Sequence, residues 1–358
     1  MRSFDEIFED KTKYGTKIKT SEYKEIGKYA IIDQGQEEIA GYTDLEKGVF
    51  EDVPAIIFGD HTRVIKYVRD PFFLGADGVK ILKCKELNAN YKYLYYALKN
   101  AKIPNTGYNR HFKWLKQIQI ECPSIDKQEK IVKILDKVVM VIEDRRKEIQ
   151  ELDKLIKARF IELFGTYPGN EKGWNTGNIR DVVSEVRYGS SRPAVDGGRY
   201  PYLRMNNITY GGELDLSDTK RIDIPDSELA KCTVRHGDVL FNRTNSTELV
   251  GKTCVYNRDE MMVLAGFVIR VRVNEKVLPE FLSAFLNTDF SKKMLLGMCK
   301  TAIGQANINA QELQNIGLYV PPIDLQQEFV DFKIQVNKSK VIYPTLLNKL
   351  TIFTKSLL

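Results

Sequence analysis

The chain carries an internal repeat, and this repeat constrains its fold more than any other feature. Residues 123–131, PSIDKQEKI, recur as PPIDLQQEF at 321–329, a shift of 198 positions (123 to 321). Upstream, residues 78–98 resemble residues 266–286 with a shift of 188 (78 to 266). Shifts that change along the chain indicate insertions in surface loops, which tolerate them. A repeat of this length predicts a duplicated domain rather than a solenoid.

Each copy has the same order: a strand-rich segment, a boundary marked by proline, and a long helix. The first helix is expected over 126–164, where apolar residues recur at alternating steps of four and three, as in a coiled-coil seam. These residues are Ile131, Leu135, Val138, Ile142, Ile149, Leu152, Ile156 and Leu163. About 39 residues at 1.5 Å each predict a rod of roughly 58 Å.

The second helix is expected over 325–358 and is less regular. Pro344 lies inside it, and a proline in a helix interior is expected to kink or split the helix. Two helices with apolar stripes most simply pack on each other, antiparallel, and separate two globular heads. The alternative is that each helix covers the sheet of its own head.

The heads are expected to be rich in β-structure. Runs of apolar and β-branched residues between Gly- and Asn-rich turns predict strands, and the clearest runs are 55–59, 79–84, 200–205, 238–242 and 267–273. Short helices are expected at 91–100 and 279–290. The predicted class is α+β, with an internal pseudo-twofold repeat. The predicted domains are a first head at 1–121, a first spacer helix at 122–165, a second head at 166–321 and a second spacer helix at 322–358.

Composition excludes several classes of protein. The longest apolar runs, such as VVMVI at 138–142, are far too short to span a bilayer. The N-terminus MRSFDEIFED has acids where a signal peptide needs an apolar core. Five scattered cysteines without a CxxC pair, and only three histidines, argue against a disulfide framework and a structural zinc site. We expect a cytoplasmic protein with no membrane association and no metal of its own. The net charge of +6 permits nucleic-acid binding without requiring it.

Residues 241–253, FNRTNSTELVGKT, end like a phosphate-binding loop. Such a loop needs a glycine five residues before the Gly that precedes its lysine, because the backbone there wraps the phosphates. Ser246 occupies that position. The residues after Lys252, TCVY, favour a strand where the loop needs a helix. The segment is therefore not expected to bind a nucleotide.

Other catalytic patterns are also incomplete. Residues 70–73, DPFF, lack the second proline of the corner that holds a target amine in amino-methyltransferases, and a turn between strands is expected there. Asp226 and Glu228 crowd one short loop, whereas the metal ligands of a nuclease converge from separate strands. His61, His111 and His236 lie in no nucleophile-elbow context. An enzyme of these classes therefore has little support.

Four loops instead combine side chains that read nucleic acids. They are GDHTRVIK at 59–66, TGYNRHFKW at 106–114, RMNN at 204–207 and NRTNS at 242–246. Arg and Lys can pair with guanine edges or phosphates, Asn and Gln with adenine, and Thr with a phosphate or a thymine methyl. The alternative for any single loop is that Asn and Thr cap turns and the aromatic rings fill the core.

These segments resemble those of the DNA-specificity subunit of type I restriction-modification systems. The resemblance covers nearly the whole chain. Its marks are two target-recognition domains, each followed by a helix that begins Pro-x-x-x-x-Gln, here Pro123 to Gln128 and Pro321 to Gln326. In the second head YPYLRMNNI, GDVLFNRTNSTELVGKT and IGQANI are similar to recurring family segments. GQANI at 304–308 finds a counterpart in GYNRH at 107–111, and at the shift of 198 Asn109 also aligns with Asn307.

The resemblance implies a non-catalytic subunit that binds double-stranded DNA. Each head would read one half of a split target, and the helices would set the spacing. The helices would also dock two methyltransferase subunits, with restriction and translocase subunits joining them. S-adenosylmethionine, ATP and Mg²⁺ would then belong to the partners. The alternatives are a stand-alone DNA methyltransferase or nuclease, and a helix-mediated adaptor without a DNA role.

The candidate residues follow from the loops and the resemblance. In the second head, the expected DNA contacts are Arg243, Asn245, Ser246, Arg204, Asn206, Asn207, Tyr188, Ser190, Lys252, Gln305 and Asn307. In the first head they are His61, Thr62, Arg63, Tyr108, Asn109 and Arg110. The residues expected to support subunit docking on the helices are Gln128, Ile131, Leu135, Val138, Ile142, Gln326 and Phe329.

Overall fold

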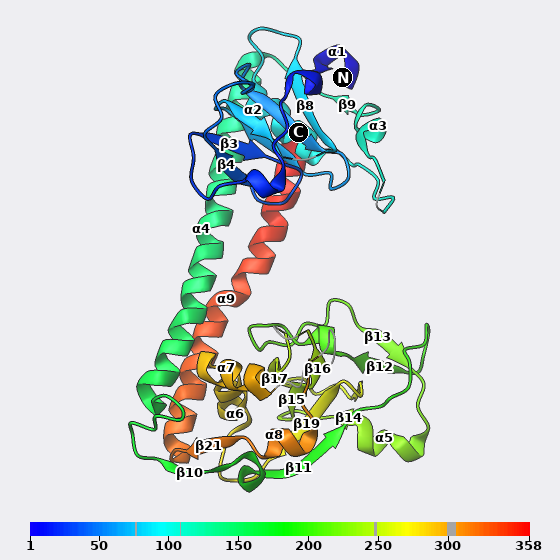
Figure 1. Ribbon diagram of the computed structural model, residues 1–358. Helices are drawn as coiled ribbons and strands as arrows, with labels where there is room; N and C mark the ends of the chain where they lie inside the picture. The colour runs from blue at the N-terminus through cyan, green and yellow to red at the C-terminus, as the bar shows by residue number, and fades with distance from the viewer. Residues whose placement is uncertain (76, 108, 247–248, 299–305) are drawn as a thin grey trace. The chain divides into compact units, whose positions relative to one another are not determined.

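The computed structural model describes residues 1–75, 77–107, 109–246, 249–298 and 306–358. These residues divide into two compact units, Met1–Arg145 with Tyr343–Leu358, and Arg146–Ile342. Each unit holds one β-rich head and a part of each of two long helices, α4 (Ile125–Phe164) and α9 (Ile323–Leu357), as Figure 1 shows. The predicted α+β class is confirmed.

The two heads share one strand order, which confirms the duplication. In the main sheet of the first head the order is β2-β8-β5-β6, and in the second head it is β11-β19-β15-β17. All neighbours in both sheets are antiparallel. The strands are β2 (Phe8–Asp10), β8 (Val79–Cys84), β5 (Ala55–Gly59), β6 (Ile65–Val68), β11 (Val183–Tyr188), β19 (Val268–Val273), β15 (Val239–Asn242) and β17 (Thr253–Val255).

Each head adds a smaller sheet built around one parallel pair. This pair is β3 with β7 in the first head and β12 with β18 in the second, and β4 or β13 lies antiparallel beside it. A further strand, β14, extends the sheet of the second head. The bounds are β3 (Tyr29–Ile32), β4 (Gly41–Thr43), β7 (Phe72–Leu74), β12 (Tyr200–Leu203), β13 (Lys220–Ile222), β14 (Thr233–Val234) and β18 (Met262–Leu264).

A short antiparallel pair joins the start of each head to its end. In the first head β1 (Arg2–Ser3) pairs with β9 (Gln119–Ile120), and in the second β10 (Asn175–Asn178) pairs with β21 (Gly317–Val320). In each pair the later strand, β9 or β21, is the last strand before a long helix. Further short elements are α1 (Phe4–Ile7), η1 (Thr12–Tyr14), η2 (Thr20–Glu22), η3 (Ile179–Val182), α5 (Asp226–Cys232) and α8 (Ala310–Gln314).

The main sheet of the second head is buried on both faces. Successive side chains of a strand point to opposite faces. In β15, Val239 and Phe241 therefore pack into one hydrophobic cluster, whereas Leu240 packs into another. The first cluster includes Phe160 and Phe164 at the end of α4. The end of this long helix is thus part of the core of the second head.

The short helices agree with the sequence prediction except at one break. The helix at 91–100 is found as α2 (Tyr91–Asn100), and the side chain of Asn90 accepts a hydrogen bond from the Tyr93 N–H at its start. The single helix expected at 279–290 is instead α6 (Pro279–Leu286) followed by α7 (Asp289–Met298). The break falls at Asn287 and Thr288, and the Thr288 hydroxyl accepts a hydrogen bond from the Ser291 N–H at 3.3 Å, as the side chain of a residue that caps the start of a new helix does.

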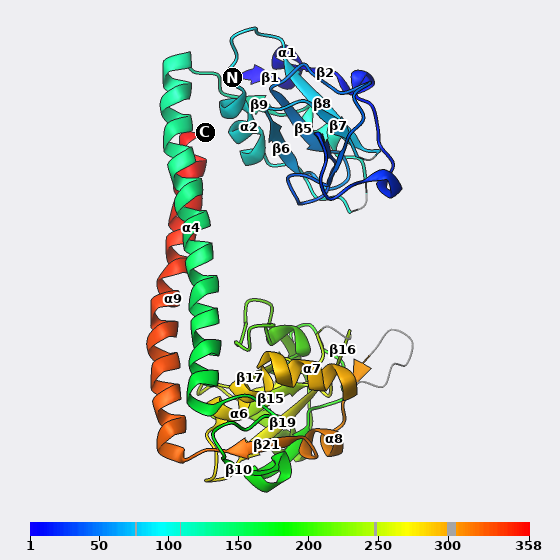
Figure 2. The ribbon, with the colours of Figure 1, turned by 60° about the vertical axis from the view of Figure 1, so that its left-hand side comes forward.

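The long helices run antiparallel where both lie in the second unit (Figures 1 and 2). Asp153 of α4 pairs with Lys340 of α9, and further along α4, Arg159 pairs with Glu328. Residue numbers thus rise along one helix while they fall along the other. At the end of this contact the ring of Phe160 lies 5.2 Å from that of Phe329, in an edge-to-face arrangement. The antiparallel packing predicted from the two apolar stripes is present in this unit.

Pro344 does not split the second helix. α9 continues as one helical element from Ile323 to Leu357, so the predicted split is wrong, whereas a kink at Pro344 stays a prediction. A helix can retain a proline where packing stabilises the rest of it, at the loss of one backbone hydrogen bond.

Among the described residues, no helix combines the length and hydrophobicity that crossing a membrane requires.

Candidate nucleic-acid interface

The segment that resembles a phosphate-binding loop contributes strands instead, two to the main sheet and one to a separate two-stranded pair. It runs from β15 through β16 (Thr244–Asn245) to β17, so the predicted strand after Lys252 is confirmed. Lys252 is buried, and its Nζ donates to the Met205 carbonyl at 3.1 Å. Burial lowers the pKa of Lys252. Gly251 takes a φ of +77°, which L residues with a side chain rarely adopt. The lysine therefore fastens β17 to the neighbouring turn.

Arg243 is held from both sides of its backbone. Its N–H donates to the Phe267 carbonyl at 3.0 Å, and its carbonyl accepts from the Ile308 N–H at 2.9 Å. Immediately after it, β16 pairs with β20 (Ala306–Asn307), with Thr244 opposite Asn307. The Arg243 side chain consequently projects from a backbone that cannot move independently.

The Arg243 guanidinium lies over an aromatic ring. Its central carbon is 4.9 Å from the centre of the Tyr188 ring. The Tyr188 hydroxyl accepts a hydrogen bond from the Ala310 N–H at 2.8 Å, which fixes the ring. The Nε atom of Arg243 is buried without a hydrogen-bond partner among the described residues. Tyr188 and Arg243, both predicted DNA contacts, are thus brought together.

The other predicted residues of this loop divide into exposed and loop-forming side chains. Asn307 is exposed, and its Oδ1 accepts from the Thr244 hydroxyl at 3.1 Å. Asn245 accepts from the Ser246 N–H at 2.9 Å, so its amide stabilises the turn. Ser190 is buried at the start of the neighbouring loop, where its N–H donates to the Leu264 carbonyl. Gln305 lies outside the described residues.

The RMNN segment forms the turn η4 (Met205–Asn207) after β12. Asn207 is buried: its Oδ1 accepts from the Arg204 N–H and its Nδ2 donates to the Asp215 carbonyl at 2.8 Å. The Arg204 guanidinium pairs with Asp218 at 2.9 Å. Asn206 is exposed. In this segment Asn207 shapes the loop, and Asn206 is the side chain most open to a ligand.

The first head places Asp60 where the second head has Arg243. The Asp60 N–H donates to the Gly78 carbonyl at 2.6 Å, and its own carbonyl accepts from the His111 N–H at 2.8 Å, the same pattern as Arg243 with Phe267 and Ile308. His111 is therefore the counterpart of Ile308, which agrees with the match of GYNRH to GQANI. This contact gives a shift of 197 (111 to 308), whereas the short helices that follow begin after His111 and Asn309, a shift of 198; the alignment of Asn109 with Asn307 therefore stays a prediction.

Gln34 organises the loop of the first head and was missed from the sequence. Its Oε1 accepts from the His61 N–H at 3.2 Å, and its Nε2 donates to the Asp77 carbonyl at 3.0 Å. The Thr62 hydroxyl donates to the Gln34 carbonyl at 2.6 Å. The repeat could have revealed it, because KYAII at 28–32 matches RYPYL at 199–203 and so places residues 33–36 at the position of RMNN.

The remaining predicted contacts of the first head have different environments. Arg63 has a φ of +62°, and its Nη1 donates to the Ile103 carbonyl at 3.3 Å. Asn109 and Arg110 are exposed, and Asn109 donates to the Thr106 carbonyl. Tyr108 lies outside the described residues. Direct contact of any of these side chains with DNA stays a prediction.

The glutamines at the start of both long helices make the same contact. Gln128 donates to the Pro123 carbonyl and Gln326 to the Pro321 carbonyl, each at 2.8 Å. Gln326 also donates to the Lys276 carbonyl at 3.1 Å and accepts from the Leu278 N–H at 2.8 Å. Each glutamine therefore locks its helix to the loop that leads into it.

The apolar residues expected to support docking lie inside the units. Ile131 and Leu135 pack into the core of the first head, with Leu357 and Leu358 beside them, and Phe329 packs into the core of the second head. Val138 is buried and Ile142 is partly buried. These side chains stabilise the helices from within, so a docking partner would meet other faces of α4 and α9.

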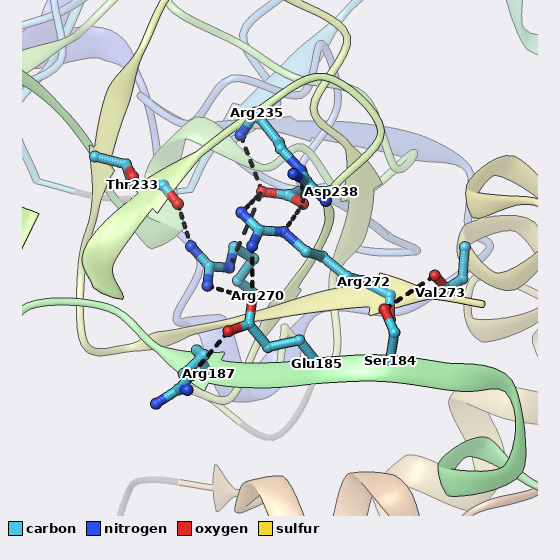
Figure 3. A network of polar contacts seen from close by, with 9 residues as sticks. All are labelled: Ser184, Glu185, Arg187, Thr233, Arg235, Asp238, Arg270, Arg272 and Val273. Carbon is cyan, nitrogen blue, oxygen red and sulfur yellow. Dashed lines mark hydrogen bonds and ion pairs between the residues drawn. The ribbon is translucent and has the colours of Figure 1, made fainter. Parts of the chain in front are cut away.

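An ion network connects the two sheets of the second head (Figure 3). We call the four residues Glu185, Asp238, Arg270 and Arg272 the Arg270 network. Arg272 donates to Asp238 at 2.8 Å, and both arginines donate to Glu185, at 2.8 Å from Arg270 and 2.6 Å from Arg272. Arg270 also donates to the Thr233 carbonyl of β14 in the smaller sheet. The network therefore links the main sheet, through β19, to the smaller sheet of the same head.

Burial and charge act in opposite directions within this network. The side chains of Asp238 and Arg270 are only 1% and 2% exposed. Burial tends to raise the pKa of Glu185, but the hydrogen bond from Arg187 and the charges of Arg270 and Arg272 outweigh it and hold that pKa below its ordinary value. Glu185 is therefore expected to stay ionised at neutral pH and to provide a negative charge opposite Arg270 and Arg272.

The described residues contain no group of three or more His, Cys, Asp or Glu side chains placed to hold a metal ion. A cavity of about 360 Å³ lies in the second unit, between the helices and α7, and Lys292 lines it. Burial, followed by the charges of Lys157 and Lys252, lowers the pKa of Lys292 to about 8. Lys292 donates to the Gly251 carbonyl at 2.5 Å, so this lysine supports the loop that carries β17.

Comparison with known proteins places these features in one family. The family model described as the type I restriction modification DNA specificity domain matches residues 1–154 and 171–350. The specificity subunit of the type I restriction enzyme EcoKI from Escherichia coli is 23% identical over 229 residues, which are 60% of this chain and 49% of that protein. The putative MjaX specificity subunit from Methanocaldococcus jannaschii is 26% identical over 159 residues, 43% of this chain and 37% of that protein. The chain thus spans half or less of the length of these curated relatives.

Two solved structures share the fold. The S subunit of the type I restriction-modification system from M. genitalium has a TM-score of 0.55 at 16% identity and covers 99% of this chain and 94% of its own. A chain from a structure on complex assembly and conformational transition of the type I R-M system has a TM-score of 0.54 at 16% identity, with 100% and 93% covered. The duplicated heads, the helix entries and the family match over most of the chain lead to one conclusion: the chain belongs to the type I restriction modification DNA specificity family.

Proposed function

We propose that this chain is the DNA-specificity subunit of a type I restriction-modification enzyme. Each head reads one half of a split target in double-stranded DNA, and the two helices set the distance between the halves. The observation that carries the proposal is the duplicated head: the same strand order occurs in both heads, and the same backbone pattern recurs at Arg243 and at Asp60. Two equivalent heads with different side chains in their loops suit a reader of two different half-sites.

The chain acts in this proposal as a scaffold without a catalytic step. Two methyltransferase subunits dock on faces of α4 and α9 outside the hydrophobic cores, and restriction and translocase subunits join them. S-adenosylmethionine, ATP and Mg²⁺ are bound by those partners, and the complex works in the cytoplasm. A stand-alone methyltransferase or nuclease would itself bind the methyl donor or the metal, and titration calorimetry on the isolated chain separates that possibility.

The proposal is tested by exchanging one head. Residues 167–321 are replaced by the corresponding segment of another family member, and the methylated positions of the host genome are mapped before and after the exchange. The expected result is that one half of the methylated target changes while the other half stays the same. If both halves stay the same, the two heads do not read the target. The isolated complex should also bind the split site with a strong dependence on salt.

A further inference from the structure

Arg243 differs from most other arginines of the second head in having no acidic partner. Arg192, Arg199 and Arg204 pair with Glu228, Asp226 and Asp218 respectively. Among the described residues, no carboxylate lies within 4.0 Å of the Arg243 guanidinium. Its donors are therefore not engaged by an ion pair within the described part of the chain.

The surroundings of Arg243 limit which of its nitrogen atoms can meet a ligand. The Tyr188 ring covers one face of the guanidinium at 4.9 Å, and the Nε atom is buried without a hydrogen bond to any described residue. With one face and the Nε atom covered, the two terminal nitrogens are the donors left to meet a ligand.

We propose that Arg243 reads a guanine in the half-site of the second head, and that Tyr188 acts as its positioning residue. Two parallel donors of a planar guanidinium match the O6 and N7 acceptors of guanine in the major groove. Tyr188 is itself fixed by its hydrogen bond from Ala310, so it limits the directions that the side chain can take. This inference rests on the proposed function, since it names a base for the site already described.

The first head lacks this device at the equivalent position. Asp60 replaces Arg243, and its Oδ1 accepts the Phe112 N–H at 2.7 Å at the start of α3 (Phe112–Leu115). The carboxylate is thus occupied within the protein. The guanine preference is accordingly assigned to one half-site only, and the other half-site serves as an internal reference.

The test measures base preference at each position of the split target. The chain is assembled with its methyltransferase partner and bound to a library of split sites randomised in the second half-site, and the bound DNA is sequenced. The R243A variant should lose a preference for guanine at one position by roughly 10- to 100-fold. R243K should lose part of it, because an ammonium lacks the two-pronged geometry. The other positions and the first half-site should stay unchanged.

Tyr188 is separated from Arg243 by two substitutions. Y188F keeps the ring under the guanidinium and should keep the guanine preference, whereas Y188L removes the ring and should weaken the preference at the same single position. R199A is the matched control, because Arg199 also lies 4.9 Å over a tyrosine ring, that of Tyr200, but is paired with Asp226. R199A should leave the preference as it is. Thermal melting of each variant confirms that the head is folded.

Three results would overturn the inference. If R243A lost affinity equally for all DNA sequences, and the salt dependence of binding fell by about the amount of one phosphate contact, Arg243 would contact the DNA backbone rather than a base. An unchanged preference in folded R243A and R243K would remove Arg243 from the interface. If Y188L lost base preference at several positions of the target and R243A lost it at none, Tyr188 would act independently of Arg243. If the unaltered complex itself selects no split site, the proposed function fails, and this is seen before any variant is compared.

Discussion

Replacing Asp238 by asparagine tests whether the Arg270 network holds the second head together. Asp238 lies directly before β15, accepts from Arg272 at 2.8 Å, and accepts from the Arg235 N–H at 2.9 Å. Its side chain is 1% exposed, so water cannot take over these contacts. Asparagine keeps the shape and one acceptor oxygen but removes the charge. The arginines of the network then have only Glu185 as a counter-charge.

The expected loss of stability follows from this imbalance. Removing one partner of a buried ion pair costs about 3–5 kcal/mol, because the other charge stays buried without compensation. Since the introduced amide could still accept one hydrogen bond and Glu185 still faces both arginines, we expect a loss of about 3 kcal/mol, at the lower end of this range. A unit of this size has a urea dependence of roughly 2–3 kcal/mol per M, which makes the expected shift of the unfolding midpoint about 1 M.

The assay reads the second head alone. The chain has two tryptophans, and Trp174 donates from its Nε1 to the Phe164 carbonyl at 3.0 Å in the second unit. In a background in which Trp114 is replaced by phenylalanine, tryptophan fluorescence during urea unfolding reports on that unit. This matters because two units do not have to unfold in one step.

The matched control is Asp289→Asn in the same unit. Asp289 also pairs with one cation, Lys157 at 2.9 Å, but its side chain is 79% exposed. An exposed pair contributes about 0.2–1 kcal/mol, so the midpoint should shift by about 0.5 M at most. If D238N shifts the midpoint no further than D289N, the network does not stabilise the head and the reasoning fails.

Three further substitutions test other contacts. Gly251→Ala should destabilise the second head by about 1–3 kcal/mol, because φ is +77° and a Cβ atom would meet Leu295 Cδ1 at 2.6 Å; Gly211→Ala, whose nearest atom is 3.9 Å away, should have little effect in the same urea unfolding. Gln326→Ala should lower the free energy of unfolding by about 2–4 kcal/mol, because it removes the side-chain partner of three backbone groups. Gln128→Ala removes the contact with the Pro123 carbonyl and should lower it by about 1 kcal/mol. Equal losses in the two variants would contradict this reasoning. The pKa of Lys292 is about 8 in the folded chain, below its ordinary value of 10.5, so the unfolded state binds more protons between pH 8 and 10.5. The stability of the unaltered chain, measured relative to that of Lys292→Met, should therefore rise as the pH increases over this range. A fall of this difference over the same range would refute the assignment.

The elements that the sequence predicted well depend on local patterns. The strands at 55–59 and 79–84 are found with the predicted bounds, and α4 begins one residue before the predicted helix. The two strands are short apolar runs, and the helix has a regular apolar stripe; both are patterns of residues that are close together in the sequence. The repeat then gave the equivalence of the two heads, because two copies of one pattern adopt one strand order.

The features that escaped prediction depend on contacts between distant residues. The alternation VIRVRV in β19 is typical of a strand with one exposed face, yet Arg270 is 2% exposed because Glu185 and the Thr233 carbonyl meet it there. Asn207 was expected at a DNA surface, yet its amide is used inside the turn. Residue type suggested which loops matter, but only the fold separates a side chain that faces outward from one that shapes the loop.

The aromatic end of α4 has a consequence for how heads of this kind can be interchanged. Phe160 and Phe164 belong to the helix in sequence, but their rings lie 5.7 and 5.0 Å from that of Phe281 in the second head. A transplanted head must therefore offer a socket for these two rings, whatever bases its loops read. Compatibility between head and helix thus depends on residues other than those of the candidate DNA-contacting loops. Under the proposed function, new specificities would arise by changing the loops while the socket stays constant.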